Sequence, residues 1–322
     1  MTYIFESGLA HHIEGLIQQK RADGYAYNSE EKLLKRFDTF CVQNYPELTT
    51  VTYEMAAKWS EARQGEGDAY HNRRMSMVKV LSEYILSLGQ EAYIPNFFCK
   101  AYRPVLYIPS KEEVKELLQK MDIRTSHNSE QFRLDRECKI LFLLYFCCGL
   151  RLSEGRLLKW EHIDLDKGIL TVLGSKGNKD RLVYLPQDSL PVLKNYKERQ
   201  EMLFPGIDWA FPGKDPHKPV SCSGIESSFN RHWAMLPVAR TVDKHPTPHC
   251  LRHAFVVERF NEWMHQGIDT NTMLPYLSRY LGHKSPDETY YYYHLVEKAF
   301  DTIREKDSVS GKVIPEVIPY EE

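Results

Sequence analysis

The chain has 322 residues, of which 42% are hydrophobic and 27% are charged, so it is long enough for two globular domains with separate cores. Its formal net charge is -2, with 42 lysines and arginines against 44 acidic residues. This balance counts against a protein that binds nucleic acid through an overall excess of basic residues. It does not exclude a DNA-binding face, because binding needs local positive charge.

Cysteine usage and the N-terminus favour a cytoplasmic protein. The 7 cysteines show no paired spacing and no zinc-ligand pattern, which favours reduced thiols. The N-terminus has no charged-then-apolar segment typical of a secretion signal. The longest apolar run, residues 140–150, is too short to cross a bilayer.

The N-terminal region is predicted to be a small helical bundle. Apolar residues recur at helical spacing over residues 33–41 and 75–86, and residues 63–68 form a polar loop between them. The second helix carries a basic, polar patch. We weigh two interpretations of this patch equally, a solvated helix face and a surface that contacts DNA phosphates. Its candidate DNA contacts are Arg73, Arg74 and Lys79.

A proline-rich stretch separates this region from the rest of the chain. Its prolines are Pro95, Pro104 and Pro109. Proline removes an amide donor and disfavours helix in the preceding residue, so the stretch is interpreted as a linker. Ser110 and Glu113 then form the pattern of a capping box, which predicts a new helix. We therefore expect one domain over residues 1–103 and another over residues 104–306.

The second domain is predicted to be mainly α-helical with a small β-sheet, an α+β fold. A long apolar helix over residues 132–146 is expected to end near Gly149. Residues 169–173 and 182–185 have the composition of strands, and residues 174–180 form a basic, glycine-rich turn between them. Further helical patterns cover residues 189–200, 250–266, 272–281 and 286–305.

Two arginines are placed where they could hold a phosphodiester. A guanidinium group is planar, permanently charged and bidentate, which suits the charge that spreads over phosphate oxygens in a transition state. Arg151 and Arg252 flank apolar segments that would hold them rigid. A surface ion pair is the commoner role of a single arginine, but two rigidly held arginines favour a phosphate clamp.

Histidines accompany both arginines. His249 precedes Arg252 near a helix N-terminus, which favours an anion, and His283 follows Gly282 at another turn. Imidazole can donate to a phosphate oxygen or accept a proton near neutral pH, so both histidines are candidates. His245 and His253 are interpreted as structural residues.

A hydroxyl nucleophile is available in the run of four tyrosines at residues 290–293. A phenol that attacks phosphorus forms a covalent phosphotyrosine, which conserves the energy of the broken bond. Chemistry alone does not choose among the four, and packing explains three of them. Lys176, in the basic turn, could protonate the leaving oxygen, although a mobile surface lysine is the commoner fate of a turn residue.

Together these stretches resemble the motifs of the tyrosine site-specific recombinases of the phage integrase class. The similar segments are the first arginine box (148–154), the lysine hairpin (174–183), the H-x-x-R box (249–253) and the segment before the nucleophile (281–283). The resemblance covers residues 105–300. Each box alone is weak, but their order and combination are specific.

The resemblance implies a role for each site residue. Arg151 and Arg252 would hold the non-bridging phosphate oxygens, and Glu154 would buttress the site. Lys176 would be the general acid for the 5′-hydroxyl, and Lys179 is a further candidate DNA contact. Family members use neither a metal ion nor a nucleotide cofactor, because one phosphodiester is exchanged for another.

The resemblance also separates the tyrosines. His249 and His283 would assist in proton handling and positioning. The spacing after His283 selects Tyr292 as the nucleophile, with Tyr291 and Tyr293 as the other choices.

Partners follow from the same resemblance. Residues 1–103 would be a helical core-binding (SAM-like) domain that clamps double-stranded DNA together with the catalytic domain, in a homo-tetramer on its recombination site. Accessory DNA-bending proteins are compatible with such an assembly, and no membrane is involved. Residues 307–322 form a tail that would dock onto a neighbouring subunit. Its candidate contacts are Ile314, Val317 and Ile318.

The leading interpretation is an enzyme that breaks and rejoins DNA at specific sites, in integration, excision or transposition. Residues 274–283 resemble transposon-encoded relatives. A type IB topoisomerase-like enzyme is the nearest alternative, but the separate N-terminal region and integrase-like boxes favour recombination. A DNA-binding regulator without catalysis is the other alternative, and the intact set of site residues argues against it.

Overall fold

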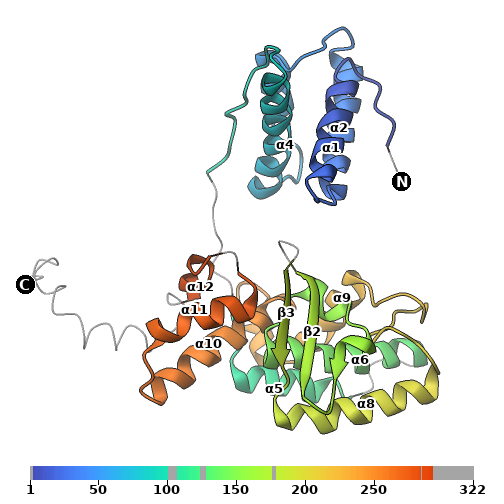
Figure 1. The fold of residues 1–322 in the computed structure, drawn as a ribbon, viewed down its shortest axis with the longest axis vertical. Coiled ribbons are helices and arrows are strands. Elements are labelled where there is room, and N and C mark those ends of the chain that lie inside the picture. Colours follow the sequence, from blue (N-terminus) through green and yellow to red (C-terminus); the bar gives the residue numbers. More distant parts are fainter. Residues whose placement is uncertain (1–2, 101–106, 124–127, 176–178, 284, 293–322) are drawn as a thin grey trace, which may run out of the picture. The chain divides into compact units, whose positions relative to one another are not determined.

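The computed structural model describes residues 3–100, 107–123, 128–175, 179–283 and 285–292 (Figure 1). This described part is mostly helical and contains a three-stranded sheet, which confirms the predicted fold class, mainly α with a small β-sheet. The chain divides into two compact units, Met1–Pro104 and Val105–Glu322. None of the helices among these residues is both long and apolar enough to span a bilayer.

The N-terminal unit is a helical bundle, as its apolar periodicity predicts. Its described residues form α1 (Ala10–Ala22), α2 (Asn28–Asn44), α3 (Tyr53–Ser60) and α4 (Asp68–Ser87). Helix α4 contacts each of the other three helices, so it forms the centre of the bundle. In the core between them, the rings of Phe37 and Trp59 meet edge to face with their centroids 5.1 Å apart.

Arg74, on α4, is an interior residue of this bundle. Its side chain is 1% exposed, and its Nε and Nη2 atoms donate to the Glu66 carboxylate at 2.6 and 2.7 Å. The guanidinium also donates to the backbone carbonyls of Trp59 and Glu61. Because these partners hold the buried side chain inside the unit, we withdraw Arg74 as a candidate DNA contact.

The other two cations of the predicted patch remain at the surface. The side chains of Arg73 and Lys79 are 51% and 43% exposed. Each faces one carboxylate, Glu30 at 3.5 Å and Glu83 at 4.0 Å, and such exposed pairs contribute little to stability. Their contact with DNA stays a prediction.

The described residues of the second unit form eight α-helices in addition to the sheet. They are α5 (Lys111–Lys120), α6 (Ser129–Cys148), α7 (Leu152–Arg156), α8 (Leu190–Leu203), α9 (Cys222–Trp233), α10 (Cys250–His265), α11 (Thr270–Leu281) and α12 (Asp287–Tyr290). Three short 3₁₀ helices, Trp160–His162, Gln187–Ser189 and Pro237–Arg240, connect them. The predicted capping box of Ser110 and Glu113 is present at the start of α5.

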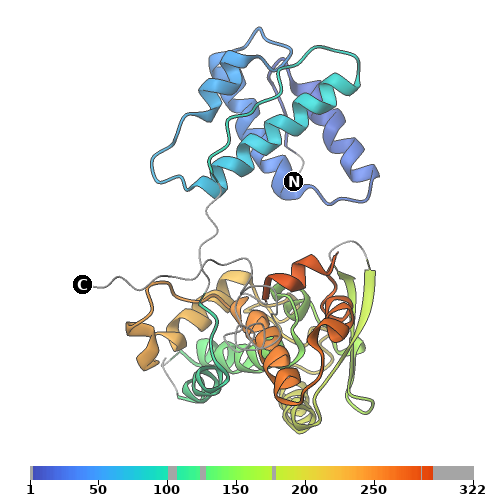
Figure 2. The same cartoon turned by 90° about the vertical axis from the view of Figure 1, so that its left-hand side faces the viewer.

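The sheet has the antiparallel order β1-β2-β3. Its strands are β1 (Ile163–Asp164), β2 (Ile169–Ser175) and β3 (Lys179–Tyr184), so both predicted strands are confirmed and β1 is additional. Side chains alternate between the two faces, since Leu170 and Val183 are buried partners whereas Leu182 and Tyr184 are exposed. Helix α11 lies beside β3 at this edge of the unit (Figure 2).

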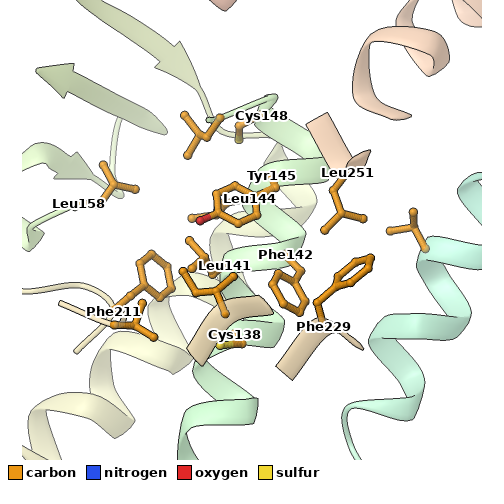
Figure 3. Packing of buried hydrophobic residues seen from close by; sticks show 14 of the residues in the cluster. Cys138, Leu141, Phe142, Leu144, Tyr145, Cys148, Leu158, Phe211, Phe229 and Leu251 are labelled. Atoms are coloured by element: carbon orange, nitrogen blue, oxygen red, sulfur yellow. The ribbon is translucent and has the colours of Figure 1, made fainter. Parts of the chain in front are cut away.

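Helix α6 is the central element of the second unit. It contacts α5, α7, α8, α9 and α10, and the predicted apolar helix is therefore buried on most sides. Its buried residues pack against surrounding elements, and the rings of Phe142 and Phe229 meet edge to face at 5.5 Å (Figure 3). Gly149 ends the helix with φ +63°, the left-handed conformation that favours glycine.

Candidate active site

Arg151 is delivered to the site by the end of α6. A Cβ on Gly149 would lie 2.6 Å from the Phe255 ring, so the chain makes its turn where only glycine fits. Arg151 then precedes α7. Its Nη1 donates to Glu154 Oε1 at 2.8 Å, and its Nη2 donates to the carbonyl of Gly282 at 2.6 Å. The guanidinium is thereby fixed against the loop that ends α11.

Arg252 donates hydrogen bonds to both of these turns. The residue lies in the first turn of α10 and is 2% exposed. Its Nη1 donates to the carbonyl of Gly149 at 2.6 Å, and its Nη2 donates to the carbonyl of Leu281 at 2.8 Å. Burial and the charge of Arg151 lower the pKa of Arg252 to about 10, so the group still carries its charge at neutral pH.

Glu154 is the carboxylate at the centre of the cluster. It is fixed by Arg151 and by Arg181, whose Nη1 and Nη2 donate to Oε1 and Oε2 at 2.8 Å each. Arg252 Nη1 lies 3.9 Å from Oε2. Burial alone would raise the pKa of Glu154, but hydrogen bonds from Arg181 and Arg151 outweigh it and lower the pKa to about 2.

Arg181 is a site residue that the sequence interpretation missed. It comes from β3 and also donates through Nε to the carbonyl of Tyr280 at 2.8 Å. The signal for it was strand alternation, because Arg181 lies two residues before the buried Val183 and so faces the interior. An arginine on the inner face of a strand needs a buried acid, and Glu154 is that acid.

His283 is oriented by two polar neighbours. Its Nε2 lies 3.1 Å from Nη2 of Arg252, and its Nδ1 lies 2.7 Å from Oγ1 of Thr289. Because a guanidinium only donates, Nε2 is the acceptor, and the ring proton is therefore on Nδ1, which donates to Thr289. The histidine is thus held in one tautomer beside the arginine cluster.

Tyr292 reaches the cluster from the segment after α12. The residue is 4% exposed and packs into a small core formed between α10 and α11. Its phenol oxygen lies 2.7 Å from Nδ1 of His253, the second residue that the sequence interpretation missed, having been taken as structural. Burial raises the pKa of the Tyr292 phenol to about 12, although Arg252 partly opposes this.

His249 and His253 stand side by side on α10. Their rings meet edge to face with centroids 4.7 Å apart, because the four-residue spacing places them on one face of the helix. His249 is exposed at the N-terminal end of the helix, whereas His253 is half-buried. This shared helix face, with His249 already a candidate, was the signal that could have identified His253.

The lysine hairpin is only partly described. Lys176 lies outside the described residues, and so do the side chain of Lys179, Tyr293 and the predicted tail at residues 307–322. The strands that flank the turn, β2 and β3, are in register from Ile169 to Val172, and their pairing becomes irregular before Ser175. Through Arg181, strand β3 is bound directly to Glu154.

The cluster has an excess of positive charge. Among the described residues, three guanidinium groups, from Arg151, Arg181 and Arg252, lie around the carboxylate of Glu154, so positive charge exceeds negative charge in this part of the site. The segments that supply them are far apart in the chain, and they meet where the turns at Gly149 and Gly282 lie together. Such a pocket is suited to an anion with several oxygens.

Comparison with known proteins agrees with this chemistry. A profile of the phage integrase family matches residues 110–299, which is more than half of the chain. A putative integrase/recombinase, y4rB, of Sinorhizobium fredii is 28% identical over 301 residues, covering 87% of this chain and 90% of the relative. Tyrosine recombinase XerC of Alcanivorax borkumensis is 27% identical, covering 87% of this chain and 86% of the relative.

Solved structures show the same fold. The Tn1549 transposon integrase, in complex with a circular intermediate DNA, superposes with a TM-score of 0.64 at 14% identity, covering 92% of this chain and 98% of the other. The XerH site-specific recombinase bound to difH substrate gives a TM-score of 0.61 at 20% identity, covering 87% and 79%. The chain therefore belongs to the phage integrase family, as its motifs predict, and is a site-specific recombinase of the tyrosine class.

Proposed function

We propose that this recombinase cleaves double-stranded DNA by attack of the Tyr292 phenol on phosphorus, forming a 3′-phosphotyrosine, and then rejoins the strands by the reverse reaction. The observation that carries this proposal is the cluster of three guanidinium groups around Glu154, with the Tyr292 phenol tied to the helix that supplies Arg252. Fixed positive charge stabilises the charge that develops on the phosphate oxygens.

The phosphate clamp consists of Arg151 and Arg252. Both side chains are fixed by carbonyls of the turns at Gly149 and Gly282, so their charges are held in place before the substrate arrives. Exposed His249 at the N-terminal end of α10 would donate to a phosphate oxygen, and His283, oriented by Thr289, would position Arg252.

The nucleophile is a neutral phenol in the resting enzyme. With a pKa of about 12, Tyr292 keeps its proton at neutral pH and must lose it as its oxygen bonds to phosphorus. Among the described tyrosines of the run, Tyr290 is 45% exposed and Tyr292 is buried against the cluster. This favours Tyr292 over Tyr290.

The leaving group is the 5′-oxygen, and Lys176 is proposed as its proton donor. Arg181 supports this role, because it fixes the strand that follows the lysine turn to the same carboxylate as Arg151. Clamp, nucleophile and general acid would then share one rigid frame, which is the condition for efficient proton transfer.

The proposed partner is double-stranded DNA, because one of the two structural neighbours is in complex with a circular intermediate DNA and the other is bound to difH substrate. Residues 1–103 would act as the core-binding domain, with phosphate contacts from Arg73, Lys79 and Lys179. We further propose a cytoplasmic homo-tetramer that serves a mobile element, with residues 307–322 docking between subunits and DNA-bending proteins as optional assistants.

Trapping the covalent adduct tests the proposal. The full chain is incubated with sheared genomic DNA of its source, the reaction is stopped in denaturant, and the attached DNA is sequenced. A nicked duplex of that sequence then accumulates the adduct, because the short product diffuses away. Wild type should form the adduct at Tyr292, and Tyr292→Phe should bind the duplex without forming it. Tyr290→Phe, at an exposed neighbour, is the matched control and should react normally.

Two results would contradict this function. A wild-type protein that binds the duplex but yields no adduct would be a binding-only regulator. Relaxation of supercoiled DNA by a monomer, without strand exchange, would identify a topoisomerase-like enzyme.

The role of Lys176 has its own test. Lys176→Ala should slow adduct formation, and a 5′-bridging phosphorothiolate should restore much of the rate, because the sulfur leaving group needs no proton. An equal loss on both substrates would argue against the general-acid role.

A further inference from the structure

The phenol of Tyr292 has one hydrogen-bond partner among the described residues, and it is not the histidine of the H-x-x-R box. Its oxygen lies 2.7 Å from Nδ1 of His253, and the two ring centroids are 5.3 Å apart. We propose that His253 holds the phenol ready for attack and accepts its proton as the phenol oxygen bonds to phosphorus. This inference rests on the proposed role of Tyr292 as nucleophile.

The direction of the hydrogen bond follows from the charge state of both groups. Burial raises the pKa of Tyr292 to about 12, so the phenol keeps its proton at neutral pH. Burial, together with His249 and Arg252, lowers the pKa of His253 to about 4, so the imidazole is neutral. A neutral imidazole has one acceptor nitrogen, and the phenol proton has no other acceptor in the described part of the chain. The phenol therefore donates to Nδ1.

His249 is placed for a different task. It is exposed at the start of α10 and has no hydrogen bond within the described residues, whereas His253 lies one turn further along and faces the phenol. Partial desolvation lowers the pKa of His249, and the charges of Arg252 and Arg151 lower it further, which places its ring near the clamp. The two histidines would divide the work, with His249 on the phosphate and His253 on the nucleophile.

The proposed step balances in atoms and charge. The Tyr292 oxygen forms a bond to phosphorus while its proton moves to Nδ1 of His253. The bond from phosphorus to the 5′-oxygen breaks, and that oxygen takes a proton from Lys176. Rejoining reverses both transfers, because the 5′-hydroxyl attacks and the departing phenolate recovers its proton from His253.

Bound DNA would make His253 a stronger base than it is in the free protein. The groups that set its pKa are burial, His249 and Arg252, and the phenol that faces it is influenced by Arg252, Tyr291, Arg151 and Glu288. A phosphate on the clamp offsets the charge of Arg252, which is one of the groups that lower the pKa of His253. The pKa of His253 should therefore rise toward the pH at which a base is most effective.

The geometry also explains why the transfer is confined to this pair. His253 is the next residue after Arg252 on α10, and Arg252 is tied to two turns by its own hydrogen bonds. Arg252 of the phosphate clamp and the partner of the phenol therefore belong to one turn of one helix. A fixed distance between them sets the line of attack.

The test compares three variants of the full chain by the rate of adduct formation in a single turnover on the nicked duplex. His253→Leu removes the acceptor and should slow cleavage by about 100-fold or more, with DNA affinity unchanged. His253→Asn keeps a carbonyl oxygen near the position of Nδ1 but no base, and should fall between Leu and wild type. His245→Asn alters an exposed histidine before α10 and should react at the wild-type rate.

Two further readouts separate proton transfer from mere packing. The wild-type rate should rise with pH through the pKa of His253 and level off, whereas the rate of His253→Asn should continue to rise with hydroxide. Added imidazole should restore part of the rate of His253→Ala, since it can enter the space left by the side chain. A melting curve of each variant verifies that the protein is folded, so that a change in either readout reports on the reaction.

The outcomes distinguish a wrong role for His253 from a wrong assignment of Tyr292 as the nucleophile. Full-rate formation of the Tyr292 adduct by His253→Leu, or an unchanged pH profile in His253→Asn, would overturn the role of His253 and leave the recombinase intact. A faster reaction of His253→Leu would overturn it too, because the histidine would then restrain the phenol. An adduct mapped by peptide mass spectrometry to another tyrosine in wild type would instead overturn the assignment of Tyr292.

Discussion

Each unit of the molecule buries an arginine against a glutamate, and the two sites differ in their charge balance. In the N-terminal bundle, the Arg74 guanidinium pairs with the Glu66 carboxylate, and two backbone carbonyls accept its further hydrogen bonds. In the second unit, Glu154 is shared by Arg151, Arg181 and Arg252, so positive charge is in excess. The charges of Arg74 and Glu66 cancel, whereas the excess positive charge around Glu154 can attract an anion.

The difference shows how a structural arginine can be told from a functional one. Burial does not separate them, because Arg74 is 1% exposed and Arg252 is 2% exposed. The number of guanidinium groups per buried carboxylate does separate the two arginines. An uncompensated buried charge costs stability, so it is expected only where binding or catalysis uses it. Four predictions test this rule.

The largest effect is expected in the neutral pair. Arg74→Met leaves the Glu66 carboxylate buried without its partner, so the free energy of unfolding of the N-terminal unit should fall by about 3–5 kcal/mol. Denaturant unfolding of the full chain measures this. Arg73→Met, at the exposed neighbour, should change it by less than about 1 kcal/mol. Equal losses for the two variants would break the comparison.

The second prediction concerns the charge excess. Arg151→Lys keeps the charge but loses the planar, two-pronged donor set, so the rate of adduct formation should fall on the order of 10²- to 10³-fold. The melting temperature should change little. Arg74→Lys is the control in the other unit, because it should lower stability and leave the rate of the bound complex unchanged. A rate loss in Arg74→Lys would show that the two sites are not independent.

Sequence patterns alone predicted the parts of the site that local rules determine. The apolar run of α6, the stop at Gly149 and the composition of β2 and β3 are local, and the structure has each where it was expected. The motifs also selected Arg151 and Arg252, which the fold brings to one carboxylate.

The missed features depend on partners that are distant in the chain. Arg181 and Glu154 meet only because the sheet packs beside α7 through β2, and His253 meets Tyr292 across 39 positions of sequence. Arg74 was misjudged for the same reason, since its acid lies in a loop before α4 and a basic helix face looks alike in sequence whether exposed or buried. The two-residue β1 is too short to carry a pattern.

The third prediction uses pH to probe the shared carboxylate. Arg181 and Arg151 lower the pKa of Glu154 from 4.5 to about 2 despite burial. A carboxyl whose pKa falls on folding contributes stability above its unfolded pKa, and the contribution is lost as pH falls toward the folded pKa. The second unit should thus lose on the order of 3 kcal/mol between about pH 5 and 2 through this group. In Glu154→Gln this loss of unfolding free energy at low pH should be absent. Denaturant unfolding of both proteins at each pH measures it. An identical acid dependence in both proteins would contradict it.

The smallest effect is expected for Arg181, which acts through geometry. Arg181→Lys should retain a charge near Glu154 but lose the pair of parallel hydrogen bonds and the bond to the Tyr280 carbonyl. The hairpin that carries Lys176 would then shift, and a misplacement of about 1 Å lowers a rate roughly 100-fold. If Arg181 positions the general acid, the loss should largely disappear on the 5′-bridging phosphorothiolate, whose leaving group needs no proton. If it served only the phosphate clamp, both substrates would react equally slowly, because the guanidinium excess acts on the phosphate whatever the leaving atom.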